Sequence, residues 1–153
     1  MATFILEKNN KMKVEIYSDG SSEGNSTGRG GWSYVIVVDG VKYRENSGHL
    51  AKATNNIAEI TGAIEGLAYV TSDSTLCTAS EVILISDSQL VLRYATGEYQ
   101  CRKFHLVPYY IKLRNFFKHL NATTRWVKGH TGDTYNERCD ELAKAARECP
   151  PIQ

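Results

Sequence analysis

The chain has 153 residues, of which 42% are hydrophobic and 23% are charged, and its formal net charge at pH 7 is +1. This length and composition are those of one ordinary globular domain, and no apolar run approaches the roughly 18 residues that a membrane-spanning helix requires. We therefore expect a single domain over residues 1–153, with residues 1–12 as a short N-terminal extension, no membrane partner and no overall charge signal for nucleic-acid binding.

Three β-strands are predicted in the first third of the chain. In the segment KVEIYSDGS (13–21), side chains alternate with a period of two, which indicates a strand that delivers Asp19 near its end. The Gly- and Ser-rich stretch at 20–31 is typical of a loop. Two β-rich runs then flank Asp39-Gly40, a dipeptide that suits a type I′ hairpin turn. We expect these strands to form an antiparallel meander.

A helix is predicted from Thr54, where apolar residues begin to recur at helical spacing. These residues are Ile57, Ile60, Ile64, Leu67 and Ala68. Thr54 and Asn55 are both candidate caps for its first turn. A polar stretch at 71–80 then leads into an apolar strand at Glu81–Ser86, which is followed directly by Asp87.

Two further helices are predicted after this strand. Residues 88–97 indicate a short helix that Gly97 ends, and Pro108 suits the first turn of a longer one. The apolar stripe of the longer helix consists of Tyr109, Leu113, Phe116, Phe117 and Leu120. Both helices therefore have a face that can pack against a sheet.

The last part of the chain predicts a fifth strand at 123–129 and a final helix. Thr134 can cap this helix, with Glu137 three residues later as in a capping box. Its apolar face consists of Cys139, Leu142, Ala143 and Ala146. Pro150-Pro151 should end the helix.

The order of these elements predicts an α/β fold with a five-stranded mixed sheet, an antiparallel hairpin meander plus parallel strands, and helices on its faces. Strands that are joined by right-handed crossovers run parallel, so the first and fourth strands should end at the same edge. This arrangement would bring Asp19 and Asp87 together, at the kind of sheet edge where open α/β sheets bind ligands.

Crowded carboxylates at such an edge suggest a metal site. Two carboxylates in a poorly solvated cleft repel each other unless a cation lies between them, and oxygen donors suit Mg²⁺ or Mn²⁺. Glu59 and Asp140 both lie off the apolar stripes of their helices and could point into the same site. Alternatively, Asp19 is only a turn residue and Asp87 only the N-cap of the helix that follows it.

Cysteine usage and the N-terminus favour a cytoplasmic protein. Cys77, Cys101, Cys139 and Cys149 are widely spaced and form no zinc-binding pattern, so we expect reduced thiols. The first ten residues lack the features of a secretory signal. One region is locally basic, because residues 93–130 contain eight Lys and Arg against a single acid, Glu98. This run is either a solvated helix face or part of a nucleic-acid contact.

Four ordered segments resemble the signature segments of type 1 ribonuclease H. They are YSDGS (17–21), TNNIAEI (54–60), LISDSQLV (84–91) and VKGHTGDTYNERCDELAKAA (127–146). The resemblance extends from Val14 to Arg147 and implies the RNase H-like fold. It also implies a metal-dependent endonuclease that hydrolyses the RNA strand of RNA–DNA hybrids without sequence specificity, leaving 3′-hydroxyl and 5′-phosphate ends.

The resemblance also implies roles for individual residues. The family's Asp-Glu-Asp-Asp set, which binds two Mg²⁺ ions with Mn²⁺ as a substitute, matches Asp19, Glu59, Asp87 and Asp140. Two ions about 3.5–4 Å apart would clamp an in-line displacement at the scissile phosphate. His130 matches the family histidine that assists proton transfer or product departure. Without the family match, His130 would be read as a surface loop residue.

Substrate contacts follow from the same resemblance and from residue type. Four uncharged side chains suit 2′-hydroxyls and base edges in the minor groove of an A-like duplex. They are Asn25, Asn55, Asn56 and Gln89. Thr54 with Lys52 could anchor a phosphate of the DNA strand. Alternatively, Asn55 and Asn56 only cap their helix.

Two segments depart from the family pattern. Many bacterial relatives carry a Trp- and Lys-rich helical handle where this chain has the short, Trp-free segment at 97–110. The segment GNSTGRGG (24–31) also differs, because relatives commonly have prolines there. Hybrid binding would then depend on residues such as Arg102 and Lys103.

Three other interpretations remain. One is a DNA nuclease, integrase or resolvase on the same carboxylate-bearing sheet, and another is a hybrid-binding module without activity. The chain could also be the ribonuclease H domain of a reverse transcriptase, although its start at Met1 and its end soon after the last helix favour a free-standing enzyme. The favoured hypothesis is a monomeric cytoplasmic ribonuclease H whose partner is the hybrid duplex.

Overall fold

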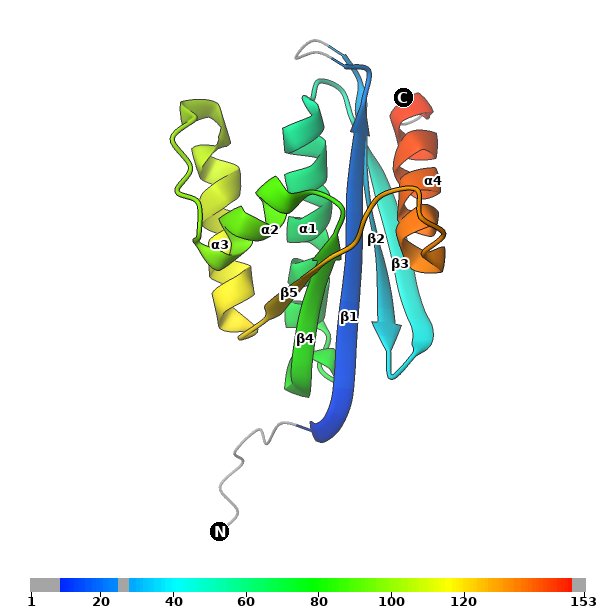
Figure 1. Ribbon diagram of the computed structural model, residues 1–153, viewed down its shortest axis with the longest axis vertical. Coiled ribbons are helices and arrows are strands. Elements are labelled where there is room, and N and C mark those ends of the chain that lie inside the picture. Colours follow the sequence, from blue (N-terminus) through cyan, green and yellow to red (C-terminus); the bar gives the residue numbers. More distant parts are fainter. Residues whose placement is uncertain (1–8, 25–27, 150–153) are drawn as a thin grey trace.

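The computed structural model describes residues 9–24 and 28–149, and within them the chain forms a five-stranded sheet with four α-helices (Figure 1). The strands are β1 (Asn9–Ser22), β2 (Gly30–Val38), β3 (Val41–Leu50), β4 (Ala79–Ser86) and β5 (Thr123–Trp126). The helices are α1 (Asn55–Ser72), α2 (Gln89–Thr96), α3 (Val107–His119) and α4 (Thr134–Glu148), with short 3₁₀ helices at Leu76–Thr78 and Phe104–Leu106. No helix in this part of the chain is both long and apolar enough to cross a bilayer.

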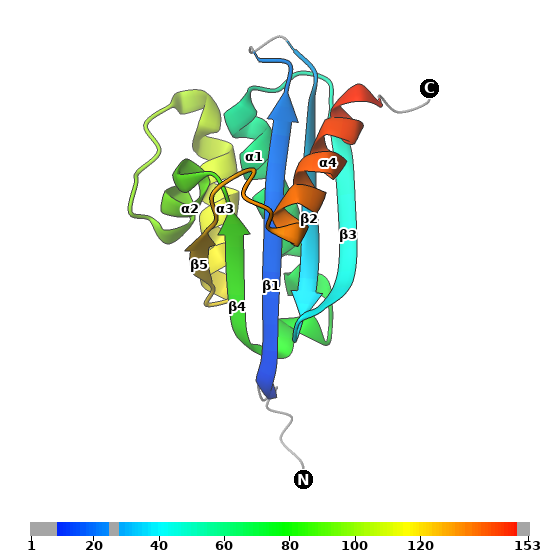
Figure 2. The same ribbon diagram turned by 45° about the vertical axis from the view of Figure 1, so that its right-hand side comes forward.

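The sheet has the strand order β3-β2-β1-β4-β5, which confirms the predicted mixed topology. β1, β2 and β3 form the antiparallel meander, whereas β4 runs parallel to both β1 and β5. The turn between β2 and β3 has positive φ angles at Asp39 (49°) and Gly40 (83°), as the Asp-Gly dipeptide predicts. The parallel pair β1 and β4 is the feature that positions the site, because both strands point toward one edge (Figure 2).

Helices cover both faces of the sheet, which explains why β1 is buried on both sides. α1 and α3 lie on one face and α4 lies on the other (Figure 2). Val14 and Ile16 belong to the core between the sheet and α1, while Tyr17 belongs to a smaller core that includes Cys139 of α4. Apolar side chains of β1 therefore pack against both layers of helices.

Several predicted boundaries differ from the observed ones. β1 begins at Asn9, so residues 9–12 of the predicted extension belong to the sheet, where Asn9 pairs with Ala79. The predicted loop at 20–31 is shorter, since β1 continues to Ser22 and β2 starts at Gly30. Antiparallel pairing of β1 with β2 continues across the glycines and serines of this stretch, because the ladder of hydrogen bonds outweighs their weak propensity for strands.

The ends of the last two elements also differ from prediction. β5 stops at Trp126. The cap of α4 is Asp133, not Thr134, because the Asp133 carboxylate accepts the N–H of Asn136 (3.0 Å). Glu137 instead accepts the N–H of Gly132 (3.2 Å). The predicted stop at Pro150-Pro151 lies outside the described residues.

All four cysteines are free thiols, as predicted. Cys139 is fully buried in the smaller core, while Cys77 and Cys101 are partly buried and Cys149 is exposed. The fold therefore depends on packing and hydrogen bonding and needs no covalent cross-link.

Candidate active site

Asp19 and Asp87 lie at the shared edge of β1 and β4, as the topology predicts. Asp19 is near the end of β1, and Asp87 follows the last residue of β4. The parallel register of β1 and β4 pairs Tyr17 with Ile85. Asp19 and Asp87 each lie two residues after their member of this pair, so they occupy matching positions along the two strands. The alternative that Asp87 caps the next helix is wrong, because Ser88 is the N-cap of α2 and accepts the N–H of Val91 (3.2 Å).

Two glycines bring α1 against the end of β1. A Cβ on Gly20 would lie 2.2 Å from the backbone of both Ala58 and Glu59. A Cβ on Gly62 would lie 2.4 Å from the carbonyl oxygen of Asp19. Helix and strand are therefore in direct backbone contact at this point, and Glu59 is held beside Asp19.

A similar contact brings α4 against β2. A Cβ on Gly31 would lie 2.1 Å from the carbonyl oxygen of Ala143 and 2.5 Å from the nitrogen of Arg147. Asp140 is one turn earlier on the same helix. The close approach at Gly31 therefore places Asp140 over the sheet edge that carries the other acids.

Electrostatic coupling shows that the four acids share one site. Burial first, and then the charges of Asp87, Asp140 and Glu59, raise the pKa of Asp19 from 3.8 to about 8, against the lowering effect of a hydrogen bond from Gly20 N–H. Burial also raises the pKa of Asp87, with Asp140 adding to the rise and His130 opposing it. Like charges in a poorly solvated cleft disfavour ionisation, so this cluster favours bound protons or a bound cation.

Glu59 has a more mixed environment. Burial and the charge of Asp87 raise the pKa of Glu59, while a hydrogen bond from the Ser88 hydroxyl lowers it. Asp140 forms an ion pair with Lys144 of the same helix, with Nζ and Oδ2 3.0 Å apart. Lys144 is the cation that partly offsets the negative charge of the cluster.

The donor set fits a hard divalent cation. All four acids supply oxygen atoms, and Mg²⁺ and Mn²⁺ prefer such ligands. Among residues 9–24 and 28–149, however, no three Asp, Glu, His or Cys side chains are arranged to hold one ion together. One of the four acids, Asp140, is engaged in the ion pair with Lys144.

The loop with His130 passes directly over Asp87. A Cβ on Gly129 would lie 3.0 Å from Oδ2 of Asp87, and the loop crosses in front of β4 and β1 (Figure 1). His130 is exposed and has a left-handed backbone (φ 59°), held in part by the Thr131 hydroxyl, which donates to the Lys128 carbonyl (2.6 Å). The structure therefore places an exposed imidazole next to the acids.

The predicted substrate residues lie around the same edge. Thr54 is the N-cap of α1, where its hydroxyl accepts the N–H of Ile57 (3.2 Å), and Lys52 is exposed just before it. Asn55 is not a cap, because its side-chain oxygen accepts the N–H (3.1 Å) and hydroxyl (2.9 Å) of Ser22. Asn55 therefore ties α1 to the end of β1.

The remaining members of this set lie in different settings. Asn56 is partly buried in the first turn of α1. Gln89 is exposed at the start of α2, where its side-chain oxygen accepts a hydrogen bond from Arg93 (3.4 Å). Asn25 lies outside the described residues.

Two supporting residues were not predicted from the sequence. Ser88 caps α2, and its hydroxyl lowers the pKa of Glu59. Trp126 donates its indole N–H to the carbonyl oxygen of Asp87 (3.1 Å). A serine at the start of a helical pattern is a recognisable signal for a cap. The contact of Trp126 depends on the pairing of β5 with β4, which one-dimensional patterns do not define.

Replacing Ser88 with Ala should lower the free energy of unfolding by about 1 kcal/mol through loss of the α2 cap. It should also raise the pKa of Glu59 further, because a hydrogen bond to its ionised form is lost. Urea denaturation measures the first effect, and the apparent affinity for Mn²⁺ measures the second. The cap of α4 offers a comparison, since Asp133→Ala should reduce stability without changing the pKa of Glu59.

Comparisons with known proteins agree with this geometry. The sequence model of the family RNase H matches residues 11–148. The chain is 37% identical to Ribonuclease H of Geotalea uraniireducens (strain Rf4) over 153 residues, covering 90% of this chain and 95% of that protein. It is also 37% identical to Ribonuclease H of Lachnoclostridium phytofermentans over 156 residues, covering 90% and 93%.

Solved structures are similar as well. RNase H1 from the archaeon Halobacterium salinarum NRC-1 has a TM-score of 0.76 at 28% identity, covering 89% of this chain and 98% of that one. LC11-RNase H1 in complex with an RNA/DNA hybrid has a TM-score of 0.78 at 26% identity, covering 89% and 97%. The family match, residues 11–148, includes all the segments that carry the acids.

Proposed function

Because the chain belongs to the type 1 ribonuclease H family, and is thus an endonuclease, we propose that it hydrolyses the RNA strand of RNA–DNA hybrids with two divalent ions held by Asp19, Glu59, Asp87 and Asp140. The products would carry 3′-hydroxyl and 5′-phosphate ends, and cleavage would not depend on sequence. The observation that carries this proposal is the convergence of four acids from β1, α1, the end of β4 and α4 on one sheet edge, where burial and neighbouring carboxylates raise the pKa of Asp19, Glu59 and Asp87.

The family is generally dependent on divalent metals, and the oxygen donors of this site suit Mg²⁺, with Mn²⁺ as a substitute. When bound, the ions would lower the pKa of the attacking water and offset the charge that develops on the scissile phosphate. Asp19 and Asp87 would be the central ligands, because both lie at the shared edge of β1 and β4 and Asp87 has the largest charge effect on the pKa of Asp19. Glu59 and Asp140 would complete the set from the two helices.

We assign His130 the proton transfer to the leaving group. Water attacks the phosphorus atom, the bond from phosphorus to the 3′ oxygen breaks, and that oxygen needs a proton. His130 is exposed on the loop beside Asp87, so its imidazole can reach a phosphate that lies at the acids. Its glycine neighbours, Gly129 and Gly132, allow the loop to adjust.

We assign hybrid recognition to the polar side chains around the acids. A related protein, LC11-RNase H1, has been solved with an RNA/DNA hybrid, which supports a hybrid as the substrate here. Asn25, Asn56 and Gln89 would contact 2′-hydroxyls and base edges of the minor groove. Thr54 and Lys52 would bind a phosphate of the DNA strand. Asn55, which is hydrogen-bonded to Ser22 at the end of β1, would contribute to the same contacts with the minor groove of the hybrid.

Oligomeric state and compartment are also part of the proposal. A monomer suffices, because one chain supplies every proposed ligand and contact. Free thiols at all four cysteines suit a reducing compartment such as the cytoplasm. Light scattering during size-exclusion chromatography should give the mass of one chain, 17.1 kDa.

The test compares labelled RNA–DNA, RNA–RNA and DNA–DNA duplexes with and without Mg²⁺. We expect cleavage of the hybrid alone, and none after chelation. Asp87→Asn should reduce the rate by about 10³-fold or more, since it removes a central ligand for charge stabilisation worth several kcal/mol. Asp39→Asn is the matched control, because Asp39 lies in the β2–β3 turn and asparagine tolerates its positive φ.

Two outcomes would contradict the proposal. Cleavage of the DNA duplex would instead favour a DNA nuclease on the same fold. Binding of the hybrid without cleavage by the unmodified protein would indicate a binding module.

A further inference from the structure

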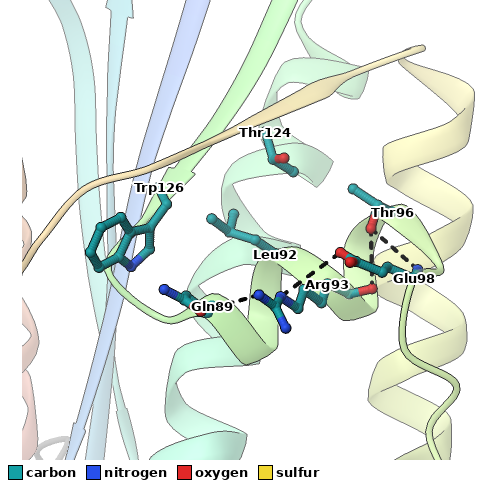
Figure 3. A pocket seen from close by; sticks show the side chains of 7 residues that line it. All are labelled: Gln89, Leu92, Arg93, Thr96, Glu98, Thr124 and Trp126. Atoms are coloured by element: carbon teal, nitrogen blue, oxygen red, sulfur yellow. Dashed lines mark hydrogen bonds and ion pairs between the residues drawn. The ribbon is translucent and has the colours of Figure 1, made fainter.

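A groove of about 230 Å³ lies between α2 and β5, next to the acids. It begins at Gln89, two residues after Asp87, and extends along the edge strand β5. Leu92 of α2 and Trp126 of β5 are both among the residues that line it (Figure 3). The polar side chains that line the groove include Arg93, Glu98 and Thr124. The groove therefore combines an apolar wall with hydrogen-bonding groups.

Arg93 is held in position for a ligand. Its guanidinium lies over the ring of Tyr99, 5.0 Å from the centroid, and donates to the Tyr99 hydroxyl. A second bond runs from its Nη2 to the side-chain oxygen of Gln89 (3.4 Å). The side chain is still 39% exposed, so part of its planar donor fork faces the groove. Such a fork suits the paired oxygens of a phosphate.

The charge of Arg93 is only loosely compensated. Its Nε lies 3.8 Å from Glu98, and the Glu98 side chain is 62% exposed, so solvent screens this pair. Glu98 is also the only acid in the sequence from Arg93 to His130, a stretch with eight Lys and Arg residues. This charge balance favours a polyanion over an acidic or neutral peptide as the occupant of the groove.

The groove is continuous with the acids. Trp126 lines it and donates its indole N–H to the carbonyl oxygen of Asp87 (3.1 Å). Gln89 lines it as well and is one of the residues assigned to the RNA strand. A strand whose phosphate lies at Asp87 would therefore have its neighbouring nucleotides beside this groove.

We propose that this groove is a subsite for the sugar–phosphate backbone of the RNA strand next to the cleavage site, with Arg93 as its phosphate ligand and Trp126 as the wall against a ribose. This inference rests on the proposed hybrid cleavage and deepens it. The short segment that contains Tyr99 would thus contribute to hybrid affinity, because Tyr99 contacts the guanidinium of Arg93. Glu98 opposes the phosphate and limits that affinity.

The first test measures hybrid cleavage by Arg93→Gln. We expect KM to rise about fivefold to tenfold with kcat within about twofold, because a charged hydrogen bond to substrate is lost away from the reacting atoms. The slope of log KM against log salt should fall by about 1, as for one lost phosphate contact. Arg93→Lys should restore the salt slope but only part of the affinity. Glu98→Gln should lower KM.

The matched control is Lys42→Gln, which makes the same charge change on β3, at the opposite edge of the sheet. KM and the salt slope of this variant should equal those of the unmodified protein. Thermal unfolding of each variant shows whether it is folded at the assay temperature. A KM for Arg93→Gln equal to that of Lys42→Gln would overturn the proposal.

A second test locates the phosphate. Neutral methylphosphonate linkages are placed singly along the RNA strand, and hybrid binding is measured by fluorescence anisotropy. At one position the unmodified protein should lose affinity about fivefold, while Arg93→Gln loses none, since the contact is already absent. Equal losses for both proteins at every position, or a coupled position found only in the DNA strand, would contradict the assignment to the RNA strand.

The two proposals fail in different ways. An unmodified protein that cleaves no hybrid contradicts the proposed function, whatever Arg93 does. Normal cleavage by the unmodified protein, together with an unchanged KM and hybrid Kd for Arg93→Gln, contradicts only the subsite.

Discussion

Replacing Asp19 with Asn should stabilise the metal-free protein at pH 8 by on the order of 3 kcal/mol while reducing hybrid cleavage at least about 10³-fold. Asp19 is 6% exposed, and its pKa is raised to about 8 by burial first and by Asp87, Asp140 and Glu59. Folding must therefore either protonate this group or hold its charge in a poorly solvated cleft. Asparagine is neutral and nearly the same size, so it removes this penalty.

The pH dependence follows from the direction of the shift. The pKa of Asp19 is higher in the folded protein (about 8) than its ordinary value of 3.8, so the folded state binds the proton more tightly. The contribution of Asp19 to stability is thus fully present below about pH 4 and is lost as the pH rises toward 8. The unmodified protein and Asp19→Asn should be similarly stable at pH 4, and the difference should grow up to pH 8.

Urea denaturation in the presence of a chelator measures this difference at pH 4, 6 and 8. Asp39→Asn serves as a control, because Asp39 lies in an exposed turn, and it should show no such trend. Addition of Mg²⁺ or Mn²⁺ should stabilise the unmodified protein much more than Asp19→Asn, since only the former has all four ligands. An Asp19→Asn protein that is no more stable than the unmodified one at pH 8 would refute the account of the cluster.

Replacing Gly20 with Ala should lower the free energy of unfolding by about 3 kcal/mol and also impair catalysis. The added Cβ would lie 2.2 Å from backbone atoms of both Ala58 and Glu59, so a whole turn of α1 must move. Glu59 moves with that turn. A displacement of roughly 1 Å at a catalytic group can reduce a rate about 10²-fold.

Gly66→Ala separates the loss of stability from the displacement of Glu59. A Cβ on Gly66 would meet the Cγ2 of Ile16 at 2.6 Å, on the same helix but away from the acids. This variant should be destabilised as well, yet it should keep its kcat at temperatures where it is folded. Calorimetric titration with Mn²⁺ should show weaker binding for Gly20→Ala only. Equal kcat and Mn²⁺ affinity for the two variants would show that Gly20 has no part in placing Glu59.

The crowded acids have a consequence for stability as well as for catalysis. Without a cation the cluster opposes folding, because like charges are brought together where water is scarce. The neighbouring structure holds them there, through backbone contacts at Gly20, Gly31 and Gly62. Stability is thereby exchanged for a cluster of carboxylates at one sheet edge, which is the usual relation at active sites.

Periodicity in the sequence was sufficient to predict the sheet and most of the helices. The spacing of apolar residues along the chain shows which face of an element is buried. This holds for the alternation in β1, the apolar run of β4 and the helical stripes of α1 and α3. The handedness of crossovers then predicted that β1 and β4 end at one edge, and hence that Asp19 lies near Asp87. The four acids and His130 were predicted as site residues from the resemblance of four ordered segments to the family.

Only the tertiary structure decided how closely these parts approach and which groups support them. The backbone contacts at Gly20 and Gly31, the bond from Trp126 to Asp87 and the Arg93 groove each join segments that are distant in sequence. Caps were decided in the same way, since Asp133 and not Thr134 is the N-cap of α4. Periodic patterns report which face of an element is buried, whereas these contacts depend on the distance between elements, which packing of the whole chain determines.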